Sequence, residues 1–139
     1  ISKKDVLRGI HFSLNESGQS KLVFCAAGKI LDYIVDLDTS SASFGKWANF
    51  ELSPEKGRML LISPKTGHGF LSLEDNTVVT YLLSSEYSQK DEFELSFLDE
   101  SLGIDLPGSG HILSEKDRTA PGISELRKLG TLPGLLGYA

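Results

Sequence analysis

The chain has few cysteines and no long hydrophobic run, which disulfide-bonded proteins and membrane proteins require. It contains one cysteine, Cys25, so no intrachain disulfide can form. Cys25 lies between Phe24 and Ala26, and we therefore expect it to pack as a small apolar residue in a protein of the reducing cytoplasm. No hydrophobic run approaches the roughly 18 residues that a membrane-spanning helix needs, and no membrane contact is predicted.

Positive charge is also scarce. The 14 lysines and arginines stand against 19 aspartates and glutamates, which gives a net charge of -5 and a pI near 5.1. Non-specific binding of nucleic acid needs a basic stripe that displaces counterions from phosphates, so this class of function is excluded. A small anionic ligand in a local basic pocket remains allowed.

The length of the chain fits one domain. With 139 residues, of which 40% are hydrophobic, it can bury a core without disulfides or structural metals. We expect a single domain over residues 1–139. Because the chain starts at Ile1, without a methionine and close to a predicted strand, we also expect an N-terminal segment to precede it.

Short apolar or alternating runs recur between turn residues along most of the chain. Such runs predict β-strands, and their even spacing favours an all-β sandwich or barrel of the jelly-roll kind. After Asp99 the chain becomes rich in Pro and Gly, and one short helix is expected over 125–129, with Ser124 as its N-cap and Gly130 at its end, packed outside the barrel. The predicted strands are 6–12, 21–27, 30–38, 47–52, 59–63, 69–73, 77–83 and 92–97.

The run of residues 7–12 combines an arginine and a histidine, Arg8 and His11, with Gln19 and Lys21 close behind in the sequence. Regular strand alternation places Arg8 on one face and His11 on the other. The set therefore needs a curved sheet, such as that of an enclosed barrel, to converge on one cavity.

Two further histidines complete the set of imidazoles. His68 lies between Gly67 and Gly69, and neither glycine has a side chain to obstruct a ligand. His111, in the Gly-rich tail, is expected to be incidental. A hydrogen-bonded structural role is the alternative for His11 and His68 alike, because neutral imidazole often serves only that purpose.

Three familiar kinds of catalytic site are not predicted. Metal sites of cupins typically pair two histidines one residue apart, whereas His11 is followed by Phe12 and Ser13, which leaves only a looser set with Glu16 and His68. No serine lies at a strand-to-helix elbow typical of hydrolases, and no Gly-rich phosphate loop of the Rossmann or Walker kind is present. We therefore expect no bound metal.

Several short pieces occur together in a specific order and spacing. They are 6–12 (VLRGIHF), 19–23 (QSKLV), 43–47 (SFGKW), 67–71 (GHGFL), Tyr81 with Tyr87, 102–105 (LGID) and 112–117 (ILSEKD). In this combination the chain resembles the dTDP-4-dehydrorhamnose 3,5-epimerase family over nearly its whole length. The resemblance implies a cupin jelly roll, a homodimer, and epimerisation of a 4-keto-6-deoxyhexose attached to dTDP without cofactor or metal.

The resemblance also assigns catalytic roles. His11 is the expected base that removes a proton beside the C4 ketone, since an imidazole ordinarily has a pKa of about 6.5, close to neutral pH. Asp99 is its expected partner, Tyr81 the acid on the opposite face, and Lys21 the cation that stabilises the enolate. Residue type alone offers plainer alternatives: Asp99 as a turn residue, Tyr81 as a core aromatic and Lys21 as a solvated lysine.

Binding roles follow from the same likeness. Arg8 and His68 correspond to contacts with the pyrophosphate and the sugar, and the guanidinium fork of arginine suits phosphate oxygens. Gln19 is expected to hydrogen-bond the nucleotide, and Tyr87 to stack on the thymine.

The chain departs from the family pattern at Leu82, at Phe97 with Leu98, and in the loop 13–18. These differences affect the expected shape of the pocket. They leave open whether C3, C5 or both carbons are inverted, and whether the sugar serves rhamnose or antibiotic synthesis. A sugar-nucleotide 3,4-ketoisomerase and a non-catalytic sugar-nucleotide-binding cupin are the alternative functions.

Overall fold

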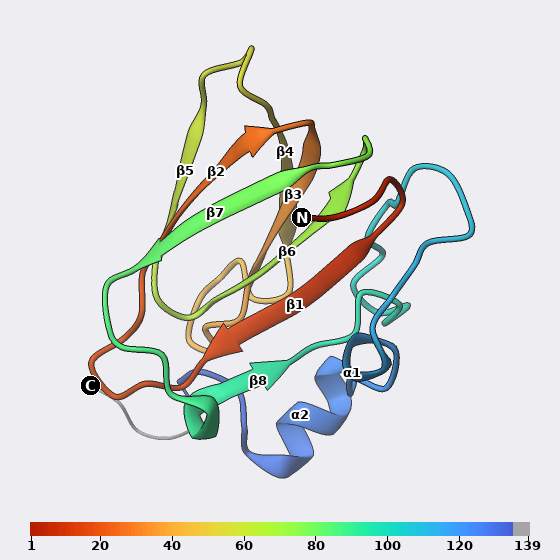
Figure 1. Ribbon diagram of the computed structural model, residues 1–139. Helices are drawn as coiled ribbons and strands as arrows, with labels where there is room; N and C mark the ends of the chain where they lie inside the picture. Colours follow the sequence, from red (N-terminus) through yellow and green to blue (C-terminus); the bar gives the residue numbers. More distant parts are fainter. Residues whose placement is uncertain (135–139) are drawn as a thin grey trace.

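Two antiparallel sheets face each other in the computed structural model, which describes residues 1–134 (Figure 1). The larger sheet has the order β4-β3-β6-β1-β8 and the smaller sheet the order β5-β2-β7. The strands are β1 Leu7–Ser13, β2 Lys21–Ala27, β3 Ile30–Asp36, β4 Trp47–Leu52, β5 Met59–Ile62, β6 Thr66–Ser72, β7 Val78–Leu83 and β8 Glu92–Glu94. The predicted all-β jelly roll is confirmed.

Each predicted strand overlaps an observed one, and the largest differences lie at β6 and β8. β6 begins at Thr66, three residues before the predicted start, so His68 lies within the strand. The run 92–97 was expected to be extended throughout, but β8 ends at Glu94. Beyond it Leu95 and Phe97 turn into the core, where they are 0% and 2% exposed. Ser96 closes the turn, because its carbonyl accepts from the Asp99 amide at 3.3 Å.

Apolar side chains form two separate cores. One lies between the two sheets and contains buried Cys25, as predicted for that residue, together with Val23, Ile30, Leu52, Ile62 and Phe70. The other lies behind the larger sheet, where Leu102, Leu126 and Leu132 of the C-terminal segment cover Tyr33 and Val35 of β3. The expectation that the tail packs outside the barrel is therefore confirmed.

Within residues 1–134, two short helices and one turn of 3-10 helix interrupt the coil. Helix α2, Ile123–Leu129, matches the predicted helix, and Gly130 ends it in a left-handed conformation with φ 68°. Its N-cap is Gly122 and not Ser124, which lies inside the helix. Helix α1, Glu115–Arg118, and the 3-10 turn η1, Gln89–Asp91, were not predicted. No helix within residues 1–134 is long and apolar enough to cross a membrane.

The register of β1 changes at the point where the site is built. Arg8 is opposite Phe70 of β6 and His11 is opposite His68, so one extra residue lies on the β1 side. As a result Arg8 and His11 both face the space between the sheets, while Ile10 is fully buried in the core behind the larger sheet. The prediction that Arg8 and His11 lie on opposite faces is wrong, because it assumed uninterrupted alternation.

Glycines allow β1 and β6 to approach closely at this irregularity. Gly9 has φ +102°, and a Cβ at this position would lie 2.7 Å from the carbonyl oxygen of His68. On the opposite strand, a Cβ at Gly69 would lie 2.6 Å from the carbonyl oxygen of Arg8 and 2.5 Å from the Phe97 ring. Any larger residue at either position would push the two histidine-bearing strands apart.

Candidate active site

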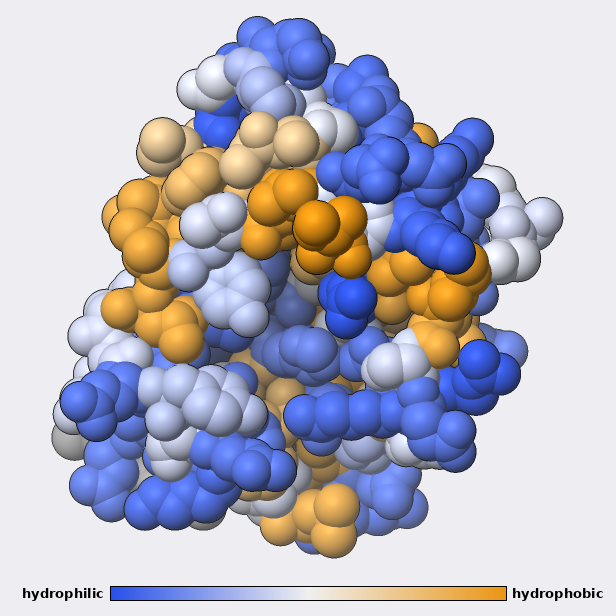
Figure 2. Space-filling model, viewed as in Figure 1, coloured by the Kyte–Doolittle hydropathy of each residue, from blue (hydrophilic) through white to orange (hydrophobic). Residues whose placement is uncertain are grey.

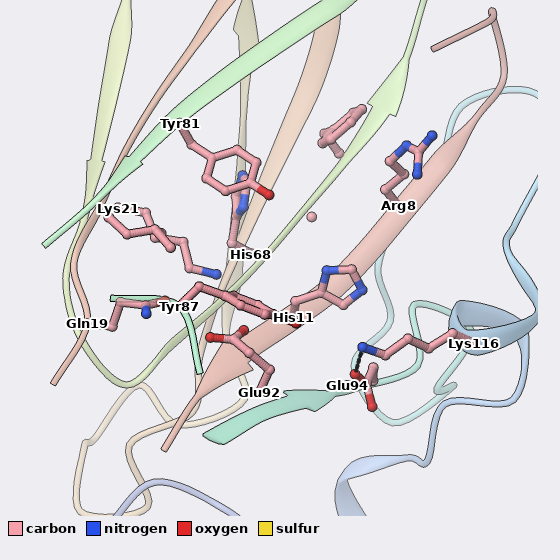
Figure 3. A pocket seen from close by; sticks show the side chains of 13 residues that line it. Arg8, His11, Gln19, Lys21, His68, Tyr81, Tyr87, Glu92, Glu94 and Lys116 are labelled. Atoms are coloured by element: carbon pink, nitrogen blue, oxygen red, sulfur yellow. Dashed lines mark ion pairs between the residues drawn. The ribbon is translucent and has the colours of Figure 1, made fainter. Parts of the chain in front are cut away.

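A cavity of about 270 Å³ opens between the two sheets, next to the apolar core there, with which it shares Phe70. Figure 2 shows it as a hollow with hydrophilic side chains around it, and Figure 3 shows the side chains that line it. The lining residues are Arg8, His11, Gln19, Lys21, His68, Gly69, Phe70, Tyr81, Leu83, Tyr87, Glu92, Glu94 and Lys116. Every site residue predicted from the sequence is among them except Asp99.

His11 is paired with an aspartate from the far end of the chain. Its Nε2 lies 2.7 Å from Oδ1 of Asp117, which is 3% exposed. The carboxylate therefore accepts from Nε2–H and leaves the lone pair of Nδ1 free. His11 is itself only half-buried, so the free nitrogen can meet a ligand in the cavity.

Asp117 is held in place by the start of helix α1. Ser114, the N-cap of that helix, donates from its hydroxyl to Asp117 Oδ2 at 2.8 Å and accepts from the Asp117 amide at 3.1 Å. The Ser-x-x-Asp spacing over 114–117 is a capping-box signal that can be read from the sequence. It would have placed a helix, and with it a fixed carboxylate, at this point.

The predicted pairing of Asp99 with His11 is wrong. Asp99 does not line the cavity, and its carboxylate accepts from the Ile123 amide at 2.6 Å, at the start of α2. It also accepts from the amide and the hydroxyl of Ser101, at 2.9 and 2.7 Å. These hydrogen bonds keep the pKa of Asp99 below its ordinary value despite partial burial. The simpler alternative of a turn residue is the correct one.

His68 has a carboxylate partner of its own. Its Nε2 lies 2.8 Å from Oδ2 of Asp32, which is fully buried on β3. Burial raises the pKa of the Asp32 carboxyl above its ordinary value, and the interaction with His68 opposes that change. The sequence gave no sign of this pair, because the two residues lie 36 positions apart. They meet because β3 and β6 are neighbours in the larger sheet.

Lys21 contradicts the ordinary expectation for a strand lysine. It begins β2 with its side chain directed into the cavity, and it is 8% exposed (Figure 3). Burial lowers the pKa of its amine below the ordinary value, while the negative charge of Glu92 opposes that change. A cation that is largely withdrawn from water interacts strongly with charge that develops beside it.

Tyr81 and Tyr87 stand at the mouth of the cavity. Tyr81 on β7 is directly opposite Val23 of β2, which is fully buried, so its side chain shares the inward face. It is nevertheless 55% exposed, and the alternative of a packed core aromatic is wrong. Tyr87 is 64% exposed, which leaves its ring available for stacking.

The rim of the cavity carries further polar groups. Arg8 is exposed, and its Nε donates to the Ser2 hydroxyl at 3.3 Å. Lys116, next to Asp117 in the sequence, forms an ion pair with Glu94. That contact raises the pKa of the Lys116 amine above its ordinary value. Glu92, Glu94 and Lys116 were all missed from the sequence, where each resembles an ordinary surface charge.

His111 lies away from the cavity, with its Nε2 3.0 Å from the carbonyl oxygen of Pro107. Within residues 1–134, no three histidine, cysteine or acidic side chains converge in a way that could hold a metal ion.

Comparison with known proteins assigns the chain to a protein family. The family model described as dTDP-4-dehydrorhamnose 3,5-epimerase matches residues 1–125. The chain belongs to this family. The dTDP-4-dehydrorhamnose 3,5-epimerase of Mycobacterium tuberculosis is 37% identical over 136 residues, which cover 96% of this chain and 67% of that protein.

Solved structures of the epimerase family agree with the fold. NovW, a 4-keto-6-deoxy sugar epimerase from the novobiocin gene cluster of Streptomyces spheroides, matches with a TM-score of 0.94 at 35% identity, covering 99% of this chain and 69% of NovW. ChmJ, a 3'-monoepimerase from Streptomyces bikiniensis solved with dTDP-quinovose, matches with a TM-score of 0.88 at 36% identity, covering 95% and 67%. The chain thus spans about two thirds of the length of these relatives.

Proposed function

We propose that the protein epimerises a 4-keto-6-deoxyhexose attached to dTDP, without metal or cofactor, inverting C5, C3 or both carbons. The observation that carries this proposal is the pairing of His11 with Asp117 at a cavity that Tyr81 and Lys21 also line. Figure 3 shows the side chains of His11, Tyr81 and Lys21 around this cavity. Inversion at a carbon beside a ketone needs a base on one face and an acid on the other. Membership of the epimerase family supports the assignment.

His11 acts as the base in this scheme. Its Nδ1 removes a proton from the carbon beside C4, and the C4 carbonyl takes up the electron pair as an enolate. The imidazolium that forms is stabilised by Asp117, which already receives Nε2–H at 2.7 Å. Because Asp117 is buried and fixed by Ser114, it also keeps the imidazole in the tautomer that can accept the proton.

Lys21 stabilises the enolate. The ammonium places positive charge near the C4 oxygen, where negative charge appears only as the proton leaves. Since Lys21 is largely buried, water competes little with this interaction. His68, held by Asp32, contacts the sugar ring in this scheme, and its place in the cavity lining supports that role.

The nucleotide occupies the open side of the cavity. Arg8 receives the pyrophosphate through its guanidinium fork, and Tyr87 stacks on the thymine. Gln19, which is held by a 3.2 Å hydrogen bond from its Nε2 to Ser85 Oγ, hydrogen-bonds the nucleotide. The complex of ChmJ with dTDP-quinovose supports a ligand of this class.

Solvent deuterium exchange tests the proposal directly. With dTDP-4-keto-6-deoxyglucose in heavy water, deuterium is expected at C5, C3 or both carbons, and the NMR spectrum should show the inverted product. Migration of the ketone to C3 would instead identify a 3,4-ketoisomerase. Binding without exchange at either carbon would identify a non-catalytic binding protein and refute the proposal.

Replacing Tyr81 with phenylalanine should separate the two proton transfers. His11 can still remove a proton and return a deuteron to the same face, so exchange should persist. Inversion should fall at least about 100-fold, because the acid on the opposite face is gone. The measurement is the ratio of deuterated starting sugar to inverted sugar, and an unchanged ratio would exclude Tyr81 as the acid.

The family resemblance also leads us to propose a homodimer. Exposed apolar side chains lie on the smaller sheet, where Met59, Leu61 and Leu82 are 64%, 74% and 60% exposed (Figure 2). A patch of this kind on a sheet surface supports association with a second copy. Analytical ultracentrifugation should give twice the mass of the chain, and a monomer at micromolar concentration would contradict this part of the proposal.

A further inference from the structure

The floor of the cavity holds a buried cation beside two acceptors that have no partner. Lys21 is 8% and Gln19 6% exposed. Within residues 1–134, neither Oε1 of Gln19 nor the buried Oε1 of Glu92 accepts a hydrogen bond. Buried polar atoms are nearly always hydrogen-bonded, so an exception of this kind calls for an explanation.

Glu92 is placed to act on Lys21. It lies on β8, opposite Ser13 of β1, and its side chain lines the cavity. In Figure 3 the Glu92 carboxylate and the Lys21 ammonium both point toward the space around the Tyr87 ring. The two groups come from different sheets, so the register of β8 against β1 decides how they approach each other.

The other carboxylates around the cavity are engaged elsewhere. In the described part of the chain they are paired as follows: Glu94 with Lys116, Asp117 with His11, and Asp32 with His68. Glu92 therefore differs from these carboxylates: it lines the cavity and forms no ion pair within residues 1–134. A lysine that loses its hydration shell tends to lose its proton unless an opposite charge is near.

We propose that Glu92 is a positioning residue whose carboxylate keeps Lys21 protonated before substrate binds, so that the ammonium is ready for the C4 oxygen. The inference rests on the proposed function, which assigns Lys21 to the enolate. Apart from the Glu94–Lys116 pair, the other charged or titratable groups that face this space are Arg8 and His11 on β1, His68 on β6, Tyr81 on β7, and Tyr87 after it.

The effect on Lys21 can be measured without any substrate. In protein labelled with ¹³C at the lysine Cε, the Lys21 resonance is identified by its loss in Lys21→Met, and its titration gives the pKa of the amine. Glu92→Gln keeps the shape but removes the charge, and the pKa of Lys21 is expected to fall by about one pH unit. Glu94→Gln, which removes the same charge from the same strand, should leave it unchanged.

Activity provides the second readout. Exchange needs protonated Lys21 and is lost as the pH rises through the pKa of that amine. A lower pKa therefore moves the alkaline limb of the kcat profile to lower pH in Glu92→Gln, with little change in KM. Glu92→Asp retains the charge, so the alkaline limb of its kcat profile should lie close to that of the unaltered protein.

The outcomes of these experiments test the role of Glu92 separately from the proposed epimerase activity on which it rests. An unchanged pKa of Lys21 in Glu92→Gln would overturn the role of Glu92, and so would an equal fall in Glu94→Gln. If Glu92→Gln does not fold, Glu92→Ala removes the same charge, and an unchanged Lys21 titration in that variant refutes the inference. Absence of exchange in the unaltered protein, with the titration shifting as expected, would refute the proposed function alone.

Discussion

Replacement of His11 by alanine is expected to abolish deuterium exchange at both carbons of the 4-keto sugar. The imidazole is the base in the proposed reaction, and its removal leaves Asp117 without the group that it orients. His68, the other imidazole that lines the cavity, contacts the sugar ring in the proposed scheme and does not replace the base. General-base catalysis by a positioned side chain contributes up to about 10⁴-fold, so the exchange rate should fall by about that factor.

The His11→Ala variant should still bind dTDP. Arg8 and Tyr87 provide the proposed nucleotide contacts, and neither depends on the imidazole. Isothermal titration with dTDP should therefore give nearly the original affinity, which also controls for folding. Retained exchange in a variant that binds dTDP normally would remove His11 from the role of base.

Asp117→Asn is expected to lower the exchange rate about 10³- to 10⁴-fold while leaving the fold intact. The amide is close in size to the carboxylate, but it cannot stabilise an imidazolium. It also favours the imidazole tautomer with the proton on Nδ1, the nitrogen that has to accept the substrate proton. The loss should therefore appear in kcat more than in KM, because the substrate contacts are unchanged.

Asp99→Asn is the matched control for this experiment. It makes the same chemical change in the same C-terminal part of the chain, but Asp99 caps α2 and lies outside the cavity. Its exchange rate should stay within about twofold of the original, while its melting temperature should fall because a capping hydrogen bond is weakened. A large loss of exchange in Asp99→Asn, with Asp117→Asn fully active, would restore the pairing expected from the sequence.

Most of the strands and the helix α2 could be predicted from local patterns in the sequence. Alternating apolar runs identified the strands, because each sheet buries one face of nearly every strand. Turn residues marked the ends, and Gly130 marked the end of α2. The errors arose where a distant contact decides the local geometry: β8 ends early because Leu95 and Phe97 turn toward the core behind the larger sheet.

The site was predicted less completely than the fold. His11, His68, Lys21 and Tyr81 were assigned their roles through the family resemblance, and all four line one cavity. The partner of His11 was misassigned, because a carboxylate in a turn and a carboxylate beside an imidazole look alike in a sequence. Asp32 and Glu92 could not be found, since their roles depend on burial and on the pairing of strands far apart in the chain.

The His11–Asp117 hydrogen bond joins residues 106 positions apart, one from the first strand and one from the tail behind the larger sheet. The partner of the base therefore comes from a segment outside both sheets, and the same segment supplies Lys116 to the cavity. Docking of the tail through Leu102, Leu126 and Leu132 is what brings Asp117 to the imidazole. Catalytic competence thus depends on the docking of the C-terminal segment as well as on the barrel, and activity reports that this segment has reached its place.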